Sequence, residues 1–218
     1  MSLRLMVPSK NSLKYSFTRK TVLVFICLVL PIISCSRQSI RPTVDHANQE
    51  LKEIRSPDIY FVPTPQEVVE KMLELAEVKK DDLIYDLGCG DGRIVVTAAK
   101  KYKCRGVGYD IDPERVIESM ENVRKNRVQG LVRIEQKDIF TLDLSEASVI
   151  TLYLLESLNV KLIPQLEKLK PGTHIVSHDF SMQGIVTPDK TVTITTDNDR
   201  QHTIYLWIAP LKKNNIVN

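Results

Sequence analysis

The chain has 218 residues, of which 43% are hydrophobic, 26% charged and 6% aromatic, which is typical of a globular protein and excludes a disordered, a collagen-like and a multi-span membrane chain. The first 35 residues carry five cations and no acid, and removing these cations from the net charge of +3 leaves −2 for residues 36–218. A slightly acidic domain gives no support for nucleic-acid binding.

Residues 1–35 have the pattern of a secretory signal. Their cations precede twelve apolar residues, Val22–Ile33, and this run is shorter than the roughly 20 residues of a membrane-spanning helix. The sequence Ile32-Ile33-Ser34-Cys35 resembles a bacterial lipoprotein cleavage box. The resemblance implies a lipidated Cys35 and a domain anchored on the exported face of a membrane. An uncleaved N-terminal anchor is the alternative, and without a functional leader the protein would be cytoplasmic.

Residues 36–55 are polar and are expected to tether a folded domain, residues 56–210, which a short tail, 211–218, follows. The domain should begin with a helix capped by Thr64. Pro65 suits the first helical position and Glu67 completes a capping-box pattern.

Further along, apolar runs alternate with helical patterns. The expected strands are Leu83–Leu87, Gly106–Asp110, Val132–Glu135, Ser148–Leu154 and Thr173–Phe180, the expected helices are Arg93–Lys101, Pro113–Asn126 and Leu158–Leu169, and a final strand pair is expected at Thr191–Thr196 and His202–Ala209. The predicted fold is therefore α/β: a Rossmann-like, seven-stranded, mostly parallel sheet with helices on both faces and a C-terminal antiparallel β-hairpin.

A glycine-rich turn joins the first strand to the next helix. It has Gly88, Gly90 and Gly92 at alternate positions, preceded by Asp86. A dinucleotide fingerprint would have a glycine where Arg93 stands. The pattern resembles motif I of class I S-adenosylmethionine (SAM)-dependent methyltransferases. A strand-end carboxylate such as Asp86 can bind the α-ammonium of SAM directly or through water, whereas the alternative is a turn that serves packing alone.

Other acids and apolar residues follow neighbouring strands. Asp110 ends the second strand and can accept hydrogen bonds from both ribose hydroxyls, while its competitor Asp112 has the pattern of a helix cap before Pro113. Ile111 and Ile139 can lie on the two sides of an adenine ring.

Several collinear segments extend the resemblance over residues 57–209. They are Phe61–Pro65, Tyr85–Ile94, Val149–Leu155, Pro171–Thr173, Ser177–Phe180 and His202–Leu206. Together they resemble the archaeal broad-specificity protein lysine methyltransferases and, more distantly, the mitochondrial ATP synthase c-subunit lysine methyltransferases. The resemblance implies SAM as cofactor and a protein substrate with exposed lysines.

The resemblance also implies roles for single residues. Val62–Thr64 would pack over the methionine part of SAM, with Thr64 at its carboxylate, and Asp138 would meet the adenine amino group. For Asp138, a role as a loop turn residue is the alternative. Archaeal members tend to have Tyr before Val-Pro, where this chain has Phe61 after Tyr60.

The acceptor end is less distinctive. Methyl transfer to an amine needs no general base once the amine has lost its proton, and the Asn/Asp-Pro-Pro-aromatic loop of amide- and base-modifying methyltransferases is replaced here by Leu152–Leu155. Tyr153 and His178 are the catalytic candidates, with a strand aromatic and a structural histidine as the alternatives. No metal site is predicted, because His174 and His178 are about 13 Å apart along a strand and Cys89 and Cys104 are isolated.

The motifs thus predict a SAM-dependent methyltransferase that modifies protein lysine ε-amines. Two alternatives remain. One is a small-molecule methyltransferase, because the cofactor half is shared across the superfamily. The other is a membrane-anchored, non-catalytic binding module on a methyltransferase scaffold, because SAM is made in the cytosol and an exported enzyme would lack its methyl donor.

Overall fold

The computed structural model describes residues 56–214. The predicted leader, its Cys35 and the predicted tether lie outside the described residues. None of the helices among these residues has the length and hydropathy of a membrane-spanning segment.

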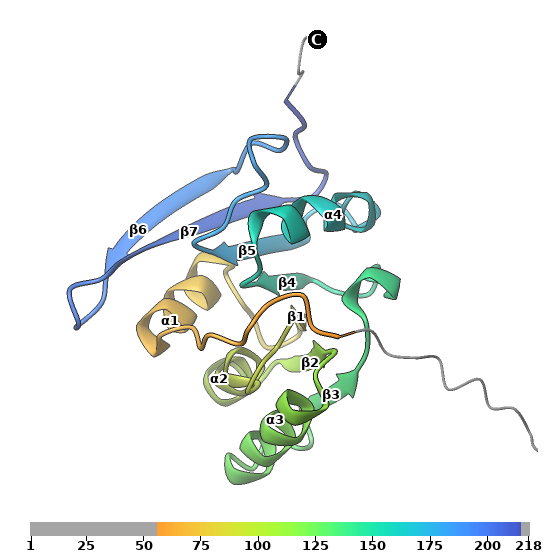
Figure 1. The fold of residues 1–218 in the computed structure, drawn as a ribbon, viewed down its shortest axis with the longest axis vertical. Helices are drawn as coiled ribbons and strands as arrows, with labels where there is room; N and C mark the ends of the chain where they lie inside the picture. Colours follow the sequence, from red (N-terminus) through yellow and green to blue (C-terminus); the bar gives the residue numbers. More distant parts are fainter. Residues whose placement is uncertain (1–55, 215–218) are drawn as a thin grey trace, which may run out of the picture. The chain divides into compact units, whose positions relative to one another are not determined.

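A seven-stranded sheet forms the centre of the domain (Figure 1). Its strands are β1 (Leu83–Leu87), β2 (Arg105–Asp110), β3 (Val132–Gln136), β4 (Val149–Leu152), β5 (His174–His178), β6 (Lys190–Thr195) and β7 (Gln201–Ile208). They lie in the order β3-β2-β1-β4-β5-β7-β6. The first five are parallel, whereas β7 is antiparallel to both β5 and β6. The predicted mostly parallel sheet and its C-terminal hairpin are confirmed.

Helices cover both faces of this sheet. They are α1 (Gln66–Leu75), α2 (Arg93–Tyr102), α3 (Pro113–Lys125) and α4 (Glu156–Leu166), with a short 3-10 helix, η1 (Ile139–Thr141), after β3. Figure 1 shows α1, α2 and α3 on one side of the sheet and α4 on the other. Neighbouring residues of a strand therefore enter different cores: Ile84 packs in the core with residues of α1 and α2, whereas Tyr85 belongs to the core that contains residues of α4.

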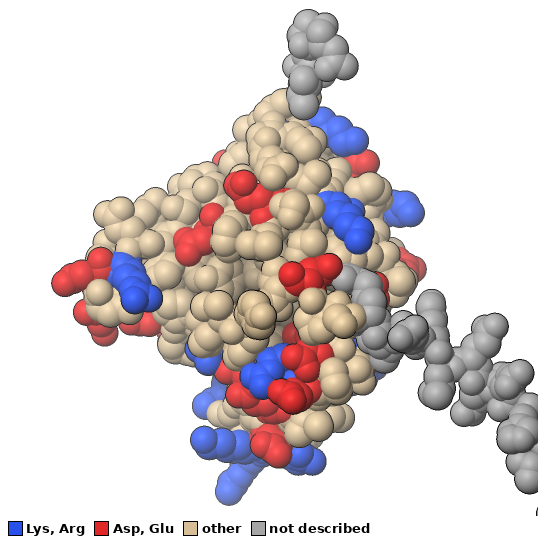
Figure 2. Space-filling model, in the orientation of Figure 1, with Lys and Arg blue, Asp and Glu red and all other residues tan. Residues whose placement is uncertain are grey.

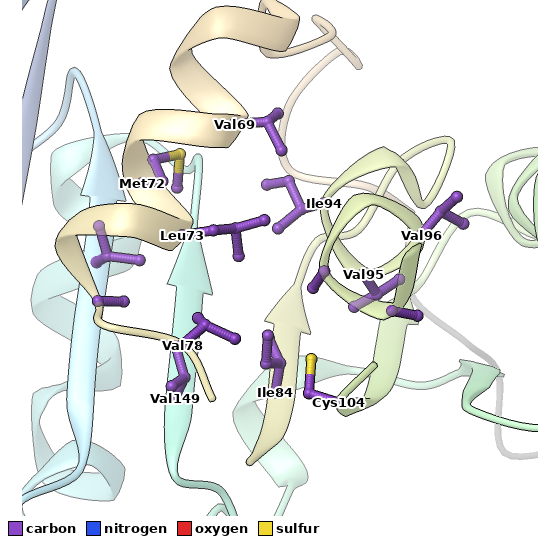
Figure 3. Close-up of a cluster of buried hydrophobic side chains, with 14 of the residues drawn as sticks. Val69, Met72, Leu73, Val78, Ile84, Ile94, Val95, Val96, Cys104 and Val149 are labelled. Atoms are coloured by element: carbon purple, nitrogen blue, oxygen red, sulfur yellow. The ribbon is translucent and has the colours of Figure 1, made fainter. Parts of the chain in front are cut away.

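Figure 3 shows the first of these cores. Val69 and Leu73 of α1 lie next to Ile94 of α2 above the face of the sheet, and Met72 and Val95 belong to the same core. Their spacing of three and four residues along α1 is what produces a single apolar stripe. This packing fixes the start of α2, and with it the glycine turn that leads into the helix.

The start of α1 differs from the prediction. The helix begins at Gln66, with Pro65 as the N-cap and no side-chain cap. Thr64 is therefore not the cap: its Oγ1 lies 3.3 Å from Nδ1 of His178 instead. The local pattern predicted that this hydroxyl would cap the helix, but it contacts a buried histidine from a distant part of the chain.

Two strands end earlier than expected. β4 stops at Leu152, so Tyr153 and the residues after it leave the sheet. β5 stops at His178 because Asp179 has a φ of 55°, a left-handed conformation that interrupts a strand. α4 also starts two residues before the expected Leu158 and ends at Leu166.

The beginning of the predicted tail packs on the domain. Lys213 forms an antiparallel bridge with Val186, and the Asn214 amide N–H donates to the carbonyl of Ile185 at 2.9 Å.

Candidate functional site

A cavity of about 230 Å³ lies at the carboxyl ends of the parallel strands, the edge at which doubly wound sheets bind their ligands. Of the residues predicted to bind cofactor, those that line it are Thr64, Asp86, Gly88, Asp110, Ile111, Asp138 and Ile139. Tyr153 also lines it, with Leu155 and Phe180 beside it. Gly90, Gly92 and the second catalytic candidate, His178, are not among the lining residues.

The glycine turn uses its own N–H groups inside the protein. The Gly88 and Cys89 amides donate to the carbonyl of Tyr109 at 2.8 and 2.9 Å, and the Gly92 amide donates to the carbonyl of Cys89 at 2.8 Å. At the start of α2, the Arg93 amide donates to the carboxylate of Asp91 at 3.2 Å. A pyrophosphate would need such donors, so their occupation argues against a dinucleotide.

Asp86 is the most deeply buried acid of the cavity. Its Oδ1 accepts a hydrogen bond from the Thr151 hydroxyl at 2.7 Å, but its Oδ2 is buried with no hydrogen-bond partner. Burial raises the pKa of Asp86 to about 7, the Thr151 hydrogen bond opposes this rise, and the nearby charges of Asp110 and Asp91 add to it. An unpaired carboxylate oxygen at a cavity wall is a binding position for a cationic group.

The carboxylates of Asp110 and Asp112 have different partners in the protein. Asp110 Oδ2 accepts from the Gly90 amide at 2.8 Å and its Oδ1 accepts from the Asp112 amide at 3.0 Å, which ties the end of β2 to the glycine turn. Burial raises the pKa of Asp110. Asp112 caps α3 by accepting from the Glu114 amide at 2.8 Å, as its pattern predicted.

Asp138 has the predicted turn role and also lies at the cavity. Its Oδ1 accepts from the Phe140 amide at 3.0 Å and so caps η1, which is the turn role. The residue also lines the cavity, on the side formed by Ile111 and Ile139. The two isoleucines thus give this end of the cavity its apolar surface.

The segment before α1 forms a wall of the cavity. Arg93 donates to the carbonyl of Thr64 at 2.9 Å and is held by Asp91, to whose Oδ2 it donates at 2.6 Å. The guanidinium thus attaches the Thr64 segment to the glycine turn. Phe61 contacts the turn at Gly90, whereas the Tyr60 side chain is 97% exposed.

The side chains of Tyr153 and His178 are in contact with each other, and of the two only Tyr153 lines the cavity. Their rings stack at 4.0 Å between centroids with an interplanar angle of 30°, and His178 is fully buried. Burial lowers the pKa of His178 to about 4; Asp179 raises it and His202 lowers it. The pKa of Tyr153 is raised by burial and by the charge of Asp179. Both side chains are therefore neutral at neutral pH.

A polar cluster behind Tyr153 was not found from the sequence. His178 Nε2 lies 2.9 Å from His202 Nδ1 and 3.1 Å from Asp179 Oδ2, and the latter two atoms are 2.9 Å apart. His202 is distant from His178 along the chain, and only the pairing of β5 with β7 brings the two together. Because 24 residues separate His178 from His202, no local spacing indicates that the two side chains meet.

The cavity residues fit SAM better than a nucleotide phosphate. The unpaired Oδ2 of Asp86 suits the α-ammonium, and the amides of Gly88, Cys89, Gly90 and Gly92 already donate within the protein. SAM supplies a methyl group on a positively charged sulfur, which leaves as a neutral thioether when the methyl is transferred.

Known proteins are similar to this chain. A family model described as the ANTKMT methyltransferase domain matches residues 86–190. The "Protein-lysine N-methyltransferase" of Saccharolobus islandicus (strain REY15A) is 47% identical over 154 residues, which are 70% of this chain and 94% of that protein. The lysine N-methyltransferase of the ATP synthase c-subunit from Homo sapiens is 28% identical over 121 residues, 55% of this chain and 51% of that protein.

A solved structure agrees with the fold and the cofactor. It is a crystal structure described as an RNA methyltransferase from Salinibacter ruber in complex with S-adenosyl-L-homocysteine, which is SAM without its methyl group. It is 47% identical, has a TM-score of 0.66, and the match covers 72% of this chain and 99% of that one. The motif order and the cavity agree with the match to nearly the whole Saccharolobus protein. The chain therefore belongs to the family of SAM-dependent methyltransferases that includes that protein-lysine N-methyltransferase.

Proposed function

We propose that this methyltransferase transfers methyl groups from SAM to lysine ε-amines of proteins. The observation that carries the proposal is the match to a protein-lysine N-methyltransferase along nearly the whole length of that relative. The match covers 94% of that relative, so it is not limited to a cofactor motif.

Within the cavity, we assign the parts of SAM to the residues predicted for them. Asp86 binds the α-ammonium and Thr64 lies at the carboxylate. Asp110 accepts from the ribose hydroxyls, Ile111 and Ile139 hold the adenine ring, and Asp138 accepts from its amino group. Gly88, Gly90 and Gly92 keep the turn free of side chains, and all three have positive φ values. The lining of the cavity by the six side chains supports these assignments.

The walls at the acceptor end suit a lysine side chain. Tyr153 and Phe180 stack with 6.0 Å between ring centroids, and Leu155 and Leu158 line the cavity beside them. Apolar and aromatic walls can contact the methylene groups of lysine while its amine reaches the methyl donor. Since the Tyr153 phenol stays protonated, the amine loses its proton to water before attack.

RNA is the competing acceptor, because the Salinibacter neighbour is described as an RNA methyltransferase. On the face that Figure 2 shows, acidic and basic side chains are interspersed and uncharged surface extends between them. RNA-binding surfaces carry clustered Lys and Arg that neutralise phosphates. This mixed surface and the net charge of −2 for residues 36–218 favour a protein acceptor.

The test is transfer of radiolabelled methyl from SAM to a mixed protein extract, to total RNA and to a small-molecule fraction in parallel. We expect label in protein and, after hydrolysis, in methylated lysine. Label in RNA or in small molecules alone would overturn the lysine proposal and leave the fold standing. A chain that binds SAM but labels none of the three fractions would support the non-catalytic binding module. Gly90→Arg, which fills the glycine turn, is the inactive control.

We also propose that Cys35 carries a lipid that anchors the domain to a membrane. Support comes from the cations, the short apolar run and the Ile-Ile-Ser-Cys box. Acyl chains anchor with about 0.8 kcal/mol per buried methylene, so two or three of them hold a protein firmly. Labelled fatty acid should enter the wild-type chain, and Cys35→Ser should remain an unlabelled, uncleaved precursor. Unmodified protein beginning at Met1 in the cytosolic fraction would contradict the anchor. It would also place the enzyme in the compartment where SAM is made.

A further inference from the structure

We propose that His178, Asp179 and His202 bind a divalent first-row transition metal ion behind the Tyr153 wall of the cavity. Among residues 56–214, these three are the His, Cys, Asp and Glu side chains whose ligand atoms converge closely enough to hold an ion. The proposal concerns a site distinct from the SAM cavity and does not rest on the identity of the methyl acceptor.

The geometry of the three ligand atoms matches one face of a coordination octahedron. His178 Nε2, His202 Nδ1 and Asp179 Oδ2 form a triangle with edges of 2.9, 2.9 and 3.1 Å. Ligands about 2.1 Å from a metal are about 3.0 Å apart on an octahedral face and about 3.4 Å apart in a tetrahedron. Two histidines and one carboxylate on a single face form the known facial donor set for such ions.

Hydrogen bonds alone leave this triangle incomplete. Each imidazole can place at most one proton on the triangle, and the carboxylate of Asp179 is an acceptor only. Two protons cannot occupy three edges, so one close contact always joins atoms with no proton between them. A cation at bonding distance from each of the three atoms attracts all three lone pairs together, and the full burial of His178 strengthens this attraction.

The backbone holds the carboxylate in place. Asp179 has a φ of 55°, which is costly for a residue other than glycine. Its second oxygen, Oδ1, accepts from the Thr203 amide at 2.7 Å, which leaves Oδ2 directed at the two histidines. The strained turn at the end of β5 and the start of β7 are thus joined through one side chain.

The cluster has an entry path. The side chain of Asp179 is 30% exposed, that of His202 is 13% exposed, and that of His178 is fully buried. Water molecules can therefore reach the site from the Asp179 side and fill the remaining metal positions, while Tyr153 covers the opposite side by stacking on His178.

Metal binding would also fix the proton on His178. With Nε2 bound to the ion, the single proton of the neutral ring lies on Nδ1 and is donated to Thr64 Oγ1, 3.3 Å away. The Thr64 hydroxyl is then a donor toward the cavity that it lines. The ion would act on the methyltransferase site through Thr64, as a positioning element.

The experiment is titration of the chelator-treated full chain with Co²⁺, followed by visible absorption, and with Zn²⁺, followed by metal counting after gel filtration. We expect one equivalent of either metal and a Co²⁺ spectrum with nitrogen ligation. His202→Gln and Asp179→Asn should each weaken binding by at least about tenfold. His174→Gln is the matched control, because His174 is on the same strand and bonds instead to the carbonyl of Ala76.

The melting temperature of each metal-free variant shows whether it is folded. Metal should raise the melting temperature of the wild type and of His174→Gln, and leave that of the two ligand variants unchanged. A folded wild type that takes up no equivalent, or equal binding by wild type and His202→Gln, would overturn the proposal. Methyl transfer to protein is measured separately, so its failure is distinguishable from a failure to bind metal.

Discussion

The ring of Phe61 occupies the space where residue 90 has no side chain. A Cβ atom on Gly90 would lie 2.1 Å from Phe61 Cε2, and Gly90 has a φ of 54°, so backbone conformation and space both favour glycine. Arg115 lies over the ring of Phe61, with its guanidinium carbon 5.1 Å from the ring centroid. The glycine turn therefore receives a protein side chain at Gly90, and the cavity wall depends on it.

Gly90→Ala should weaken SAM binding more than it lowers stability. The left-handed backbone costs about 1–2 kcal/mol with alanine, and the new methyl group must displace the Phe61 ring from the cavity wall. Gly172→Ala is the matched control, since Gly172 has a φ of 88° and a Cβ atom there would have no neighbour within 4 Å. Calorimetric SAM titration and thermal unfolding of both variants give the comparison.

Replacing Phe61 in the same chain separates the two contributions. In the Phe61→Ala background, the additional change Gly90→Ala should lower SAM affinity no more than Gly172→Ala lowers it in the wild type. An unchanged loss in that background would show that the Phe61 contact does not shape the cavity.

Asp86 should make the ligand-free protein less stable as the pH rises. Its pKa is about 7 in the folded protein against a reference of 3.8, so the folded state holds the proton more firmly than the unfolded chain. Stability from this group is complete below about pH 4, falls between about pH 4 and 7, and is constant above. Three pKa units correspond to about 4 kcal/mol as an upper bound.

Asp86→Asn should remove this pH dependence. The ligand-free variant should gain stability over the wild type between pH 5 and 8, and it should bind SAM more weakly because the carboxylate partner of the α-ammonium is lost. Denaturant unfolding across this pH range and SAM calorimetry at pH 8 measure the two effects. Parallel stability curves for variant and wild type would contradict the raised pKa.

Strand alternation and the glycine turn were sufficient to predict the fold. Buried runs such as Leu83–Leu87 have a strong local signal, and that strand has the predicted bounds. The position of the cavity was also predictable, because Asp86 and Asp110 lie at or next to the carboxyl ends of their strands and parallel strands end at one edge. The cap at Asp112 depends only on its neighbours and was predicted correctly.

Contacts between distant segments could not be predicted in this way. Thr64 matched a helix cap by local pattern, but its hydroxyl lies against His178, which is 114 residues away. The approach of His202 to His178 depends on the antiparallel pairing of β7 with β5. Local sequence contains neither the partner nor the distance in such cases, because both arise from tertiary packing.

Asp110 and Asp112 should separate in mutagenesis. Asp110→Ala removes a carboxylate that fixes the Gly90 amide and is assigned to the ribose, so SAM affinity should fall by about 1–3 kcal/mol, or roughly 5- to 150-fold. Asp112→Ala removes the cap of α3 and should cost about 1 kcal/mol of stability, with a smaller effect on SAM. Calorimetry and unfolding measure both. A larger loss of SAM affinity in Asp112→Ala than in Asp110→Ala would contradict the assignment of Asp110 to the ribose and favour Asp112 in that role.

Tyr153 should contribute a hydrogen bond and a wall, without acting as a base. Tyr153→Phe keeps the ring that stacks on His178 at 4.0 Å and removes only the hydroxyl, so kcat should fall about 2- to 13-fold, the value of one neutral hydrogen bond. Tyr153→Ala also removes the wall and should lose more. Because lysine has a reference pKa of about 10.4, the rate of both wild type and Tyr153→Phe should rise with pH toward that value. Single-turnover methyl transfer from pH 7 to 9.5 measures the slope, and a wild-type rate that stays flat while the rate of Tyr153→Phe rises with pH would make the phenol the group that accepts the amine proton.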